Sequence, residues 1–291
     1  MLRNLFALNG KTAIVTGASY GLGVTFAEAL AEAGANVVLS ARSGAKLEDV
    51  ARRITGRGGS ALGIPCDVGE PGQVSAMVSS AWQHFGRVDV LVNNAGYGNV
   101  SPVEDTPLAD FRAQIETNLF GVIIMTKAVL PYLRERASGH IIQISSIGGR
   151  VGPTGRAAYA AAKFGVEGFS ESLSKEVGPL GIKVTIIEPG GFRTHFAGSS
   201  SELREGRPEY DATVGATVRF QRNYDGKQPG DPLKAAAAIL HIASLPEPPL
   251  RLLLGSDAYS AAEKNALQIL ASDTEWKDLS TSTDYKPPAL T

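Results

Sequence analysis

Cysteine is almost absent from this chain of 291 residues, because Cys66 stands alone. No disulfide can therefore form within the chain, which excludes a disulfide-based secreted scaffold. An excess of charge of one sign is also lacking, since 28 lysines and arginines accompany 29 aspartates and glutamates, a formal net charge of −1. Nothing in this balance builds the one-sided positive field that nucleic acid requires, so we expect no nucleic-acid partner.

Long apolar runs and leader features are missing too. The nearest candidate, residues 235–243, is far shorter than the roughly 18 apolar residues that a membrane span requires, and His241 interrupts it. The first ten residues are too short for a secretory apolar region and have no small-residue cleavage site. We therefore expect a cytoplasmic protein with no membrane partner.

Clusters of metal ligands are also lacking. The histidines lie far apart in the sequence and have no companion cysteines or clustered acids, so we expect no metal site. They are His84, His140, His195 and His241.

What the chain does have is a regular alternation of short aliphatic runs with helix-length segments. The runs are almost continuously apolar, which is typical of strands covered on both faces of a parallel sheet. The alternation predicts an α/β fold, a single-domain Rossmann fold with a doubly wound, seven-stranded parallel sheet and helices on both faces. The predicted strands are 12–16, 36–40, 61–66, 88–92, 140–145, 183–187 and 250–254. The predicted helices are 21–33, 46–57, 71–85, 108–136 and 159–177.

These elements use almost the whole chain, so we expect one domain over residues 1–279 and a loosely ordered tail over 280–291. Residues 257–279 have the pattern of one further helix. Residues 195–231 break the alternation with many Gly, Ser and Arg residues and only a weak helical signal. Because they follow the sixth strand, we expect a lid over a ligand at the carboxyl edge of the sheet. We interpret His195 as a residue of this lid rather than a substrate ligand.

A glycine-rich turn joins the first strand to the first helix. Its glycines, at 17, 21 and 23, do not have the spacing of the G-x-G-x-x-G fingerprint, so the turn alone is weak evidence. Its position strengthens the signal, because a dinucleotide binds at this junction of a doubly wound sheet, with its pyrophosphate on the free amides of the helix start. The predicted ligands here are Gly17, Ser19, Tyr20, Gly21, Leu22 and Gly23.

The ends of the next three strands fit the same dinucleotide. Arg42 stands where a carboxylate would hold a ribose 2′-hydroxyl, and it offers a planar cation suited to a 2′-phosphate. Asp67, followed by Val68, either accepts a hydrogen bond from an adenine amino group or caps the next helix. Small and amide side chains after the fourth strand suit close packing on a ribose. They are Asn94, Ala95 and Gly96.

Candidate catalytic residues lie near the start of the helix predicted over 159–177. Tyr159 and Lys163 are four residues apart and share one helical face. A lysine ammonium near a phenol favours the phenolate, which lowers a pKa of about 10 and makes Tyr159 a proton donor or acceptor near neutral pH. Taken alone, such a pair is more often a plain helix surface. Ser146 closes the fifth strand.

These motifs, in this order, resemble those of the short-chain dehydrogenase/reductase family over about the first 255 residues. Residues 16–23 are similar to its glycine motif and residues 93–96 to its sheet-stabilising motif. The residues similar to its four catalytic positions are Asn118, Ser146, Tyr159 and Lys163. Those similar to its nicotinamide-side loop are Pro189, Gly190 and Thr194.

The resemblance implies an NAD(P)-dependent alcohol dehydrogenase or carbonyl reductase, which moves a hydride between nicotinamide C4 and a ketone, aldehyde or alcohol. It implies that Tyr159 is the general acid/base, and that Lys163 lowers the pKa of Tyr159 and hydrogen-bonds the nicotinamide ribose. It further implies that Ser146 holds the substrate oxygen and that Asn118 supports a water path to Lys163. Such a site accelerates the reaction by aligning the reactants and stabilising an incipient alkoxide.

The last third resembles, more loosely, the branch of retinol and 17β-hydroxysteroid dehydrogenases, which tends to use phosphorylated cofactor and apolar carbonyl substrates. Many phosphate-selective relatives have a basic residue where this chain has Tyr20, so Arg42 alone carries the prediction of NADP(H) over NAD(H). The resemblance also implies a homodimer or homotetramer. The helices predicted to form the subunit contacts are 108–136 and 159–177.

Two other functions remain open. One is a catalytically silent nucleotide-binding regulator, since a fold alone does not prove chemistry. The other is a reductase of an activated C=C bond, although enoyl reductases of the related fold usually space their tyrosine and lysine more widely.

Overall fold

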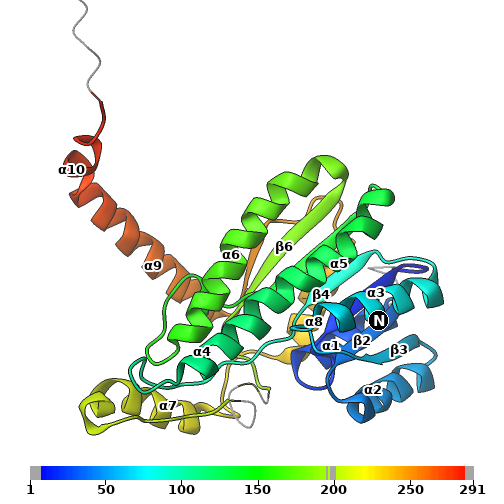
Figure 1. Ribbon diagram of the computed structural model, residues 1–291, viewed down its shortest axis with the longest axis horizontal. Helices are drawn as coiled ribbons and strands as arrows, with labels where there is room; N and C mark the ends of the chain where they lie inside the picture. Colours follow the sequence, from blue (N-terminus) through cyan, green and yellow to red (C-terminus); the bar gives the residue numbers. More distant parts are fainter. Residues whose placement is uncertain (1–7, 195, 197–200, 286–291) are drawn as a thin grey trace, which may run out of the picture.

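The computed structural model describes residues 8–194, 196 and 201–285. In these residues one sheet holds seven parallel strands in the order β3-β2-β1-β4-β5-β6-β7 (Figure 1). The strands are β1 (Thr12–Thr16), β2 (Asn36–Ala41), β3 (Ser60–Pro65), β4 (Val90–Asn93), β5 (Gly139–Ile144), β6 (Ile182–Pro189) and β7 (Arg251–Leu254). The chain reverses its direction across the sheet between β1 and β4, which is the switch point of a doubly wound fold. The predicted single-domain α/β fold is confirmed.

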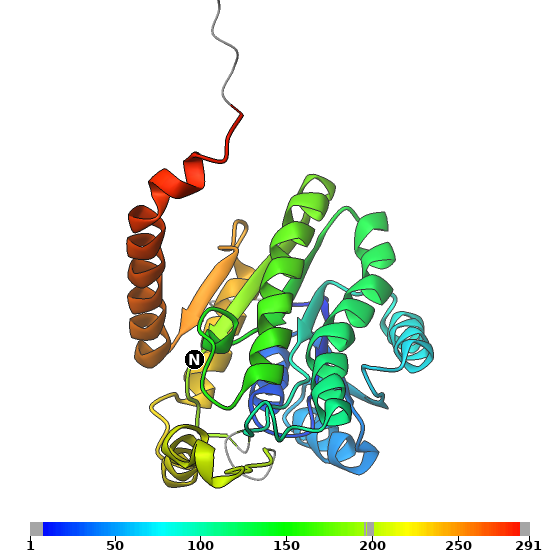
Figure 2. The same ribbon diagram turned by 60° about the vertical axis from the view of Figure 1, so that its left-hand side comes forward.

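Helices cover both faces of this sheet (Figures 1 and 2). One face carries α1 (Leu22–Glu32), α2 (Gly44–Gly56) and α8 (Pro232–Ser244). The other carries α3 (Pro71–Phe85), α5 (Gly121–Glu135) and α6 (Ala157–Val177). Successive strand residues point to opposite faces, so Ala13 and Val15 enter the first core and Ile14 enters the second. This two-sided burial explains the continuous apolar runs of the strands.

The strands and four of the predicted helices begin and end within two residues of their predicted positions. The helix predicted over 108–136 is different, because a π-helical turn, Glu116–Phe120, separates α4 (Leu108–Ile115) from α5. Such turns occur frequently at functional sites. The turn contains Asn118, which is fully buried.

By length and apolar content alone, the segment Leu108–Glu135 is suitable for crossing a membrane. The expectation of no membrane span rested on uninterrupted apolar runs, whereas this segment has the required length and mean hydropathy although polar residues interrupt it. In the structure the segment packs on the sheet, and Met125, Val129 and Leu133 are fully buried in the second core. The absence of a membrane partner stays a prediction.

The segment predicted to be a lid, residues 195–231, is more helical than expected. His195 and residues 197–200 lie outside the described residues. A 3-10 turn (Pro208–Tyr210) and a π-helical turn (Asp211–Gly215) lead into α7 (Ala216–Tyr224).

Tertiary contacts explain why the local pattern underestimates these helices. Val214 and Val218 pack with Val100 in a small core of their own, and Arg219 pairs with Asp211 at 2.6 Å. Val100 lies far from the lid in the sequence, so the local pattern of residues 195–231 does not reveal this contact.

The C-terminal helix also departs from its prediction. Two helices, α9 (Ser256–Glu275) and α10 (Lys277–Thr281), replace the single one expected. They extend away from the sheet (Figure 1). In α9 only Ala258 and Ala262 are buried. The predicted tail therefore begins inside α10, and residues 286–291 lie outside the described residues.

Candidate active site

A cavity of about 770 Å³ lies at the carboxyl ends of the strands, next to the switch point. Nearly all of the predicted site residues line it. They are Gly17, Ser19, Tyr20, Gly21, Leu22, Arg42, Asp67, Val68, Asn94, Ala95, Gly96, Ser146, Tyr159, Lys163, Pro189, Gly190 and Thr194. Gly23 and Asn118, the other two predicted site residues, do not line it. The topology thus brings together residues that are up to 177 positions apart, from Gly17 to Thr194.

The glycine turn has the geometry of a phosphate cradle. Gly17 and Gly21 have φ of 65° and 61°, a region that side chains rarely adopt. A Cβ atom on Gly17 would lie 2.9 Å from the Cα of Ala95, and one on Gly23 would lie 2.3 Å from the Gly17 carbonyl oxygen. Gly23 therefore permits the turn to pack against α1 rather than contacting a ligand. Exposed backbone at the start of α1 fits a dinucleotide pyrophosphate.

Asn94 mainly holds this turn in place. Its side-chain nitrogen donates to the carbonyl oxygen of Thr16 at 2.9 Å, while its backbone N–H and that of Ala95 donate to the Thr16 hydroxyl at 3.0 Å. These bonds join the ends of β1 and β4, the two strands that flank the switch point. Asn94 is thus a positioning residue that also lines the cavity.

At the far end of β2, Arg42 lines the cavity without a carboxylate partner among the described residues. Lys46, which was not identified from the sequence, lines the same cavity, with its Nζ 5.2 Å from the centre of the Tyr20 ring. Asp67 accepts a hydrogen bond from the Gly69 backbone at 3.0 Å, so its carboxylate shapes the loop before α3 while it lines the cavity. This end offers two cations to an anionic group.

Tyr159, Ser146 and Lys163 meet at the other end of the cavity. Tyr159 and Lys163 are buried on α6, and the Lys163 ammonium donates to the carbonyl oxygen of Ile144 at 2.7 Å. Its Nζ lies 5.7 Å from the centre of the Tyr159 ring. The Ser146 hydroxyl accepts from the Gly148 backbone at 3.0 Å, which fixes it beside the phenol.

The lowered pKa expected for Tyr159 is wrong for this structure. Burial raises the pKa of Tyr159, and the interactions that oppose this rise are the Ser146 hydrogen bond and the charge of Arg156. Burial also lowers the pKa of Lys163 to about 8, against the opposing charge of Glu167. In an apolar site the loss of hydration of the phenolate outweighs the attraction of a neighbouring amine. Tyr159 is therefore a neutral phenol at neutral pH.

Asn118 lies behind these residues, in the π-helical turn. Its Nδ2 donates to the Tyr97 carbonyl at 2.7 Å, and its Oδ1 accepts from the Tyr97 backbone N–H at 2.9 Å. A Cβ on Gly96 would lie 2.8 Å from the Asn118 oxygen and 3.8 Å from the Lys163 Nζ. Asn118 is thus next to the lysine, but it does not line the cavity.

Two further residues of the cavity were not identified from the sequence. Asp257, in the first turn of α9, accepts from the Gly191 backbone at 2.7 Å and thereby positions the loop that follows β6. No local signal reveals this contact, because 66 residues separate the partners. Arg156 precedes α6, three residues before Tyr159, and lines the cavity beside the Tyr159 ring. Its position three residues before Tyr159 could have identified it from the sequence.

The buried amine of Lys163 predicts a specific dependence of stability on pH. Its pKa is about 8 when folded, against the ordinary value of 10.5 for an exposed lysine, so between these values the unfolded chain binds more protons. The stability that the neutral amine contributes is therefore complete above pH 10.5 and is lost as the pH falls through about 8. We expect the unfolding free energy of the wild type, relative to Lys163→Met, to rise by about 3 kcal/mol over this range. Urea unfolding at several pH values measures it, and a difference independent of pH would contradict the burial of this amine.

Comparisons with known proteins identify the family to which this chain belongs. A sequence profile of the short chain dehydrogenase family matches residues 11–205. Oxidoreductase BOA17 of Botryotinia fuckeliana is 44% identical over 270 residues, which cover 93% of this chain and 98% of that protein.

Solved structures share the fold as well. A short-chain dehydrogenase from Streptomyces avermitilis superposes with a TM-score of 0.88 at 40% identity, covering 94% of this chain and 99% of that one. A metagenomic short-chain oxidoreductase in complex with NADP superposes with a TM-score of 0.69 at 29% identity, covering 85% and 97%. This chain belongs to the short-chain dehydrogenase/reductase family of oxidoreductases.

Proposed function

We propose that this oxidoreductase interconverts a ketone or aldehyde and an alcohol, with Tyr159 as the general acid/base. The observation that carries the proposal is a single cavity that joins the glycine turn and Arg42 to the group formed by Ser146, Tyr159 and Lys163. A nicotinamide bound at the end of the cavity beside Tyr159 would supply or accept the hydride.

The residues of this chain move and hold the proton. In carbonyl reduction, the neutral phenol of Tyr159 donates its proton to the substrate oxygen, and its raised pKa keeps that proton in place at neutral pH. Ser146 donates a hydrogen bond to the same oxygen and stabilises the negative charge that develops there. Lys163, charged below a pKa of about 8, stabilises the phenolate that forms and would hold the nicotinamide ribose of a bound cofactor. Asn118, beside Lys163, supports the path by which water returns the proton.

We propose NADP(H) as the preferred cofactor, with NAD(H) as a weaker one. Arg42 and Lys46 line the same end of the cavity and match the charge of a 2′-phosphate. NADP is also the ligand in one of the similar structures.

The substrate that we propose is a small molecule with an apolar body. Aromatic side chains of the lid, namely Phe196, Phe220 and Tyr224, line the cavity. The Phe196 ring lies 5.8 Å from the Tyr159 ring, centre to centre, which places an apolar wall beside the acid/base. Membership of the retinol and 17β-hydroxysteroid dehydrogenase branch stays a prediction.

We also propose a cytoplasmic homodimer or homotetramer, built through α4, α5 and α6. Phe120 and Phe164 lie at the outer surface of this helical layer with 47% of each side chain exposed. Light scattering on the purified protein tests this proposal, because the mass should be two or four times the 30.5 kDa of one chain.

A panel of aldehydes, ketones and secondary alcohols, assayed with NADP(H) and NAD(H), tests the activity. We expect oxidation of NADPH with several apolar ketones or aldehydes and no reaction with matched compounds that carry only an activated C=C bond. Reduction of the C=C compounds alone would favour an ene-reductase. Tight NADPH binding without turnover of any carbonyl compound would favour a silent regulator.

A further inference from the structure

Arg156 is a cation at the chemical end of the cavity. It lines the cavity with Tyr159 and Ser146, and its guanidinium carbon lies 5.9 Å from the centre of the Tyr159 ring. One of its nitrogens donates to the Gly98 carbonyl at 3.1 Å. Among the described residues, this carbonyl is the only hydrogen-bond acceptor that the Arg156 guanidinium has, although the group carries five N–H donors.

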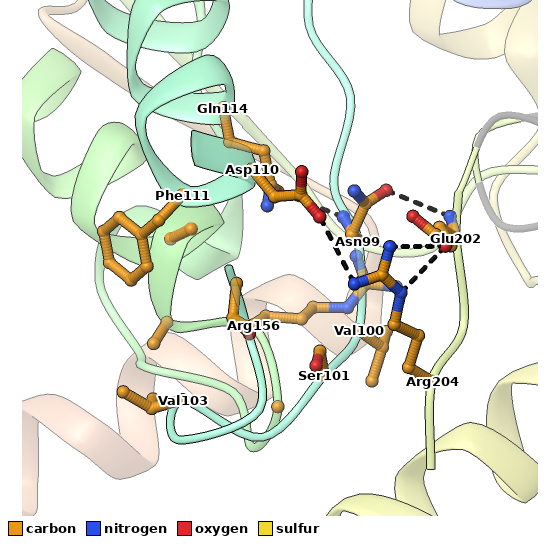
Figure 3. Close-up of a pocket in the computed structure, with 14 residues that line it drawn as sticks. Asn99, Val100, Ser101, Val103, Asp110, Phe111, Gln114, Arg156, Glu202 and Arg204 are labelled. Carbon is orange, nitrogen blue, oxygen red and sulfur yellow. Dashed lines mark hydrogen bonds and ion pairs between the residues drawn. The ribbon is translucent and has the colours of Figure 1, made fainter. Parts of the chain in front are cut away.

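The arginines of the lid are paired with carboxylates, and Arg156 is not. In the lid, Arg204 contacts Glu202 at 2.7 Å and Asp110 at 3.3 Å. Figure 3 shows both of these ion pairs beside Arg156, with no interaction drawn from a carboxylate to Arg156 itself. Within the part of the chain that the structure describes, Arg156 has no salt-bridge partner. The other lid arginines with carboxylate partners are Arg207, Arg219 and Arg222.

An unpaired cation at this position is unfavourable unless an anion joins it. Burial lowers the pKa of Arg156, which reflects the loss of hydration of its charge. Arg156 also stands at the N-cap of α6, where the helix dipole is positive and a negative group is favoured. The carbonyl of Gly98 and the ring of Tyr159 offset part of the free-energy cost of burying the Arg156 charge, but neither group is charged at neutral pH.

We propose that Arg156 binds a carboxylate of the substrate, so that the preferred substrates are oxo acids and hydroxy acids with an apolar body. A planar guanidinium binds a carboxylate through two parallel hydrogen bonds, which fixes both orientation and distance. With the carboxylate on Arg156 and the apolar body against Phe196 and Phe220, the carbonyl oxygen lies at Tyr159 and Ser146. The inference rests on the hydride-transfer function proposed above and names its substrate class.

Matched pairs of substrates test this assignment. Benzoylformate, benzoylpropionate and benzoylbutyrate vary the distance between carboxylate and carbonyl, and the methyl ester of each removes only the charge. With NADPH as reductant, we expect the wild type to reduce at least one acid with a kcat/KM at least tenfold above that of its ester. In Arg156→Gln, kcat/KM for that acid should fall by about 10- to 100-fold more than the value for its ester, because any change in the acidity of Tyr159 affects both substrates alike.

Three controls separate this role from a structural one. Arg156→Lys should restore part of the preference for the acid, because it restores the charge without the planar fork. Arg204→Gln, at a neighbouring arginine with carboxylate partners, should leave the ratio of acid to ester unchanged. The dissociation constant of NADPH should be equal in the wild type and Arg156→Gln, and the melting temperature of the variant should be no lower than that of the wild type.

The outcomes are distinguishable. Equal activity on acid and ester in the wild type, or equal losses on both in Arg156→Gln, would overturn the carboxylate assignment while leaving carbonyl reduction intact. Weaker NADPH binding in Arg156→Gln, with an unchanged ratio of acid to ester, would assign Arg156 to the cofactor instead. Failure of every carbonyl compound, neutral or charged, would contradict the proposed function itself and the inference with it.

Discussion

Tyr159→Phe should reduce kcat for carbonyl reduction by at least about 10²-fold, the loss expected when general acid/base catalysis is removed. The variant keeps the buried ring and its contact with Phe196 but removes the only proton that the phenol can donate. Because the ring sits at the chemical end of the cavity, the dissociation constant of NADPH should change by less than about twofold. Single-turnover and steady-state rates, together with cofactor titration, measure both quantities.

Tyr224→Phe is the matched control for this prediction. Tyr224 lines the same cavity from α7 and also loses only a hydroxyl, but it has no interaction with Ser146 or Lys163. Its kcat should stay within a few-fold of the wild-type value. A Tyr159→Phe variant with a near wild-type rate would remove Tyr159 from the role of acid/base.

Arg42→Ala should weaken NADPH binding by about 10- to 100-fold, with little effect on NADH. Charge-assisted hydrogen bonds to a phosphate contribute about 1.5–3 kcal/mol each, which corresponds to this range. NADH has a hydroxyl in place of the 2′-phosphate, so the same substitution removes no ionic contact. Lys46 lies on the same side of the cavity and will retain part of the attraction. The double variant with Lys46→Ala should therefore show a larger loss for NADPH than either single variant.

Arg52→Ala is the matched control, because Arg52 is an exposed arginine of α2 that pairs with Asp49 outside the cavity. It should bind both cofactors as the wild type does. Fluorescence titration of the wild type and each variant with NADPH and NADH measures the dissociation constant of each cofactor. Equal weakening of both cofactors in Arg42→Ala would reverse the proposed preference for NADP(H).

The parts of this structure that depend on local patterns could be predicted from the sequence. Strands such as β1 and β4 are nearly continuous apolar runs because both of their faces are buried, so their positions follow from the local residue pattern alone. The glycine turn could be predicted because backbone with positive φ at Gly17 and Gly21 disfavours other residues. Topology then explains why strand ends that are distant in sequence form one cavity.

The parts that depend on distant contacts could not be predicted. The π-helical turn at Glu116–Phe120 and the helical lid are stabilised by partners elsewhere in the chain, such as the Tyr97 backbone for Asn118 and Val100 for α7. The pKa of Tyr159 was misjudged because helical spacing shows that a lysine is near but not how far burial opposes ionisation. Asp257 belongs to no sequence motif, and its role could not be predicted because its contact with Gly191 exists only in the folded chain.

Transfer of a label from cofactor to product tests the central claim most directly. The protein would be incubated with an accepted ketone and NADPH that carries deuterium at both positions of nicotinamide C4, and the alcohol would be examined by mass spectrometry and NMR. The account predicts one deuterium on the carbinol carbon of the product in the wild type, and almost no labelled product over the same time in Tyr159→Phe. Unlabelled alcohol from the wild type, or equal labelling by Tyr159→Phe, would contradict it.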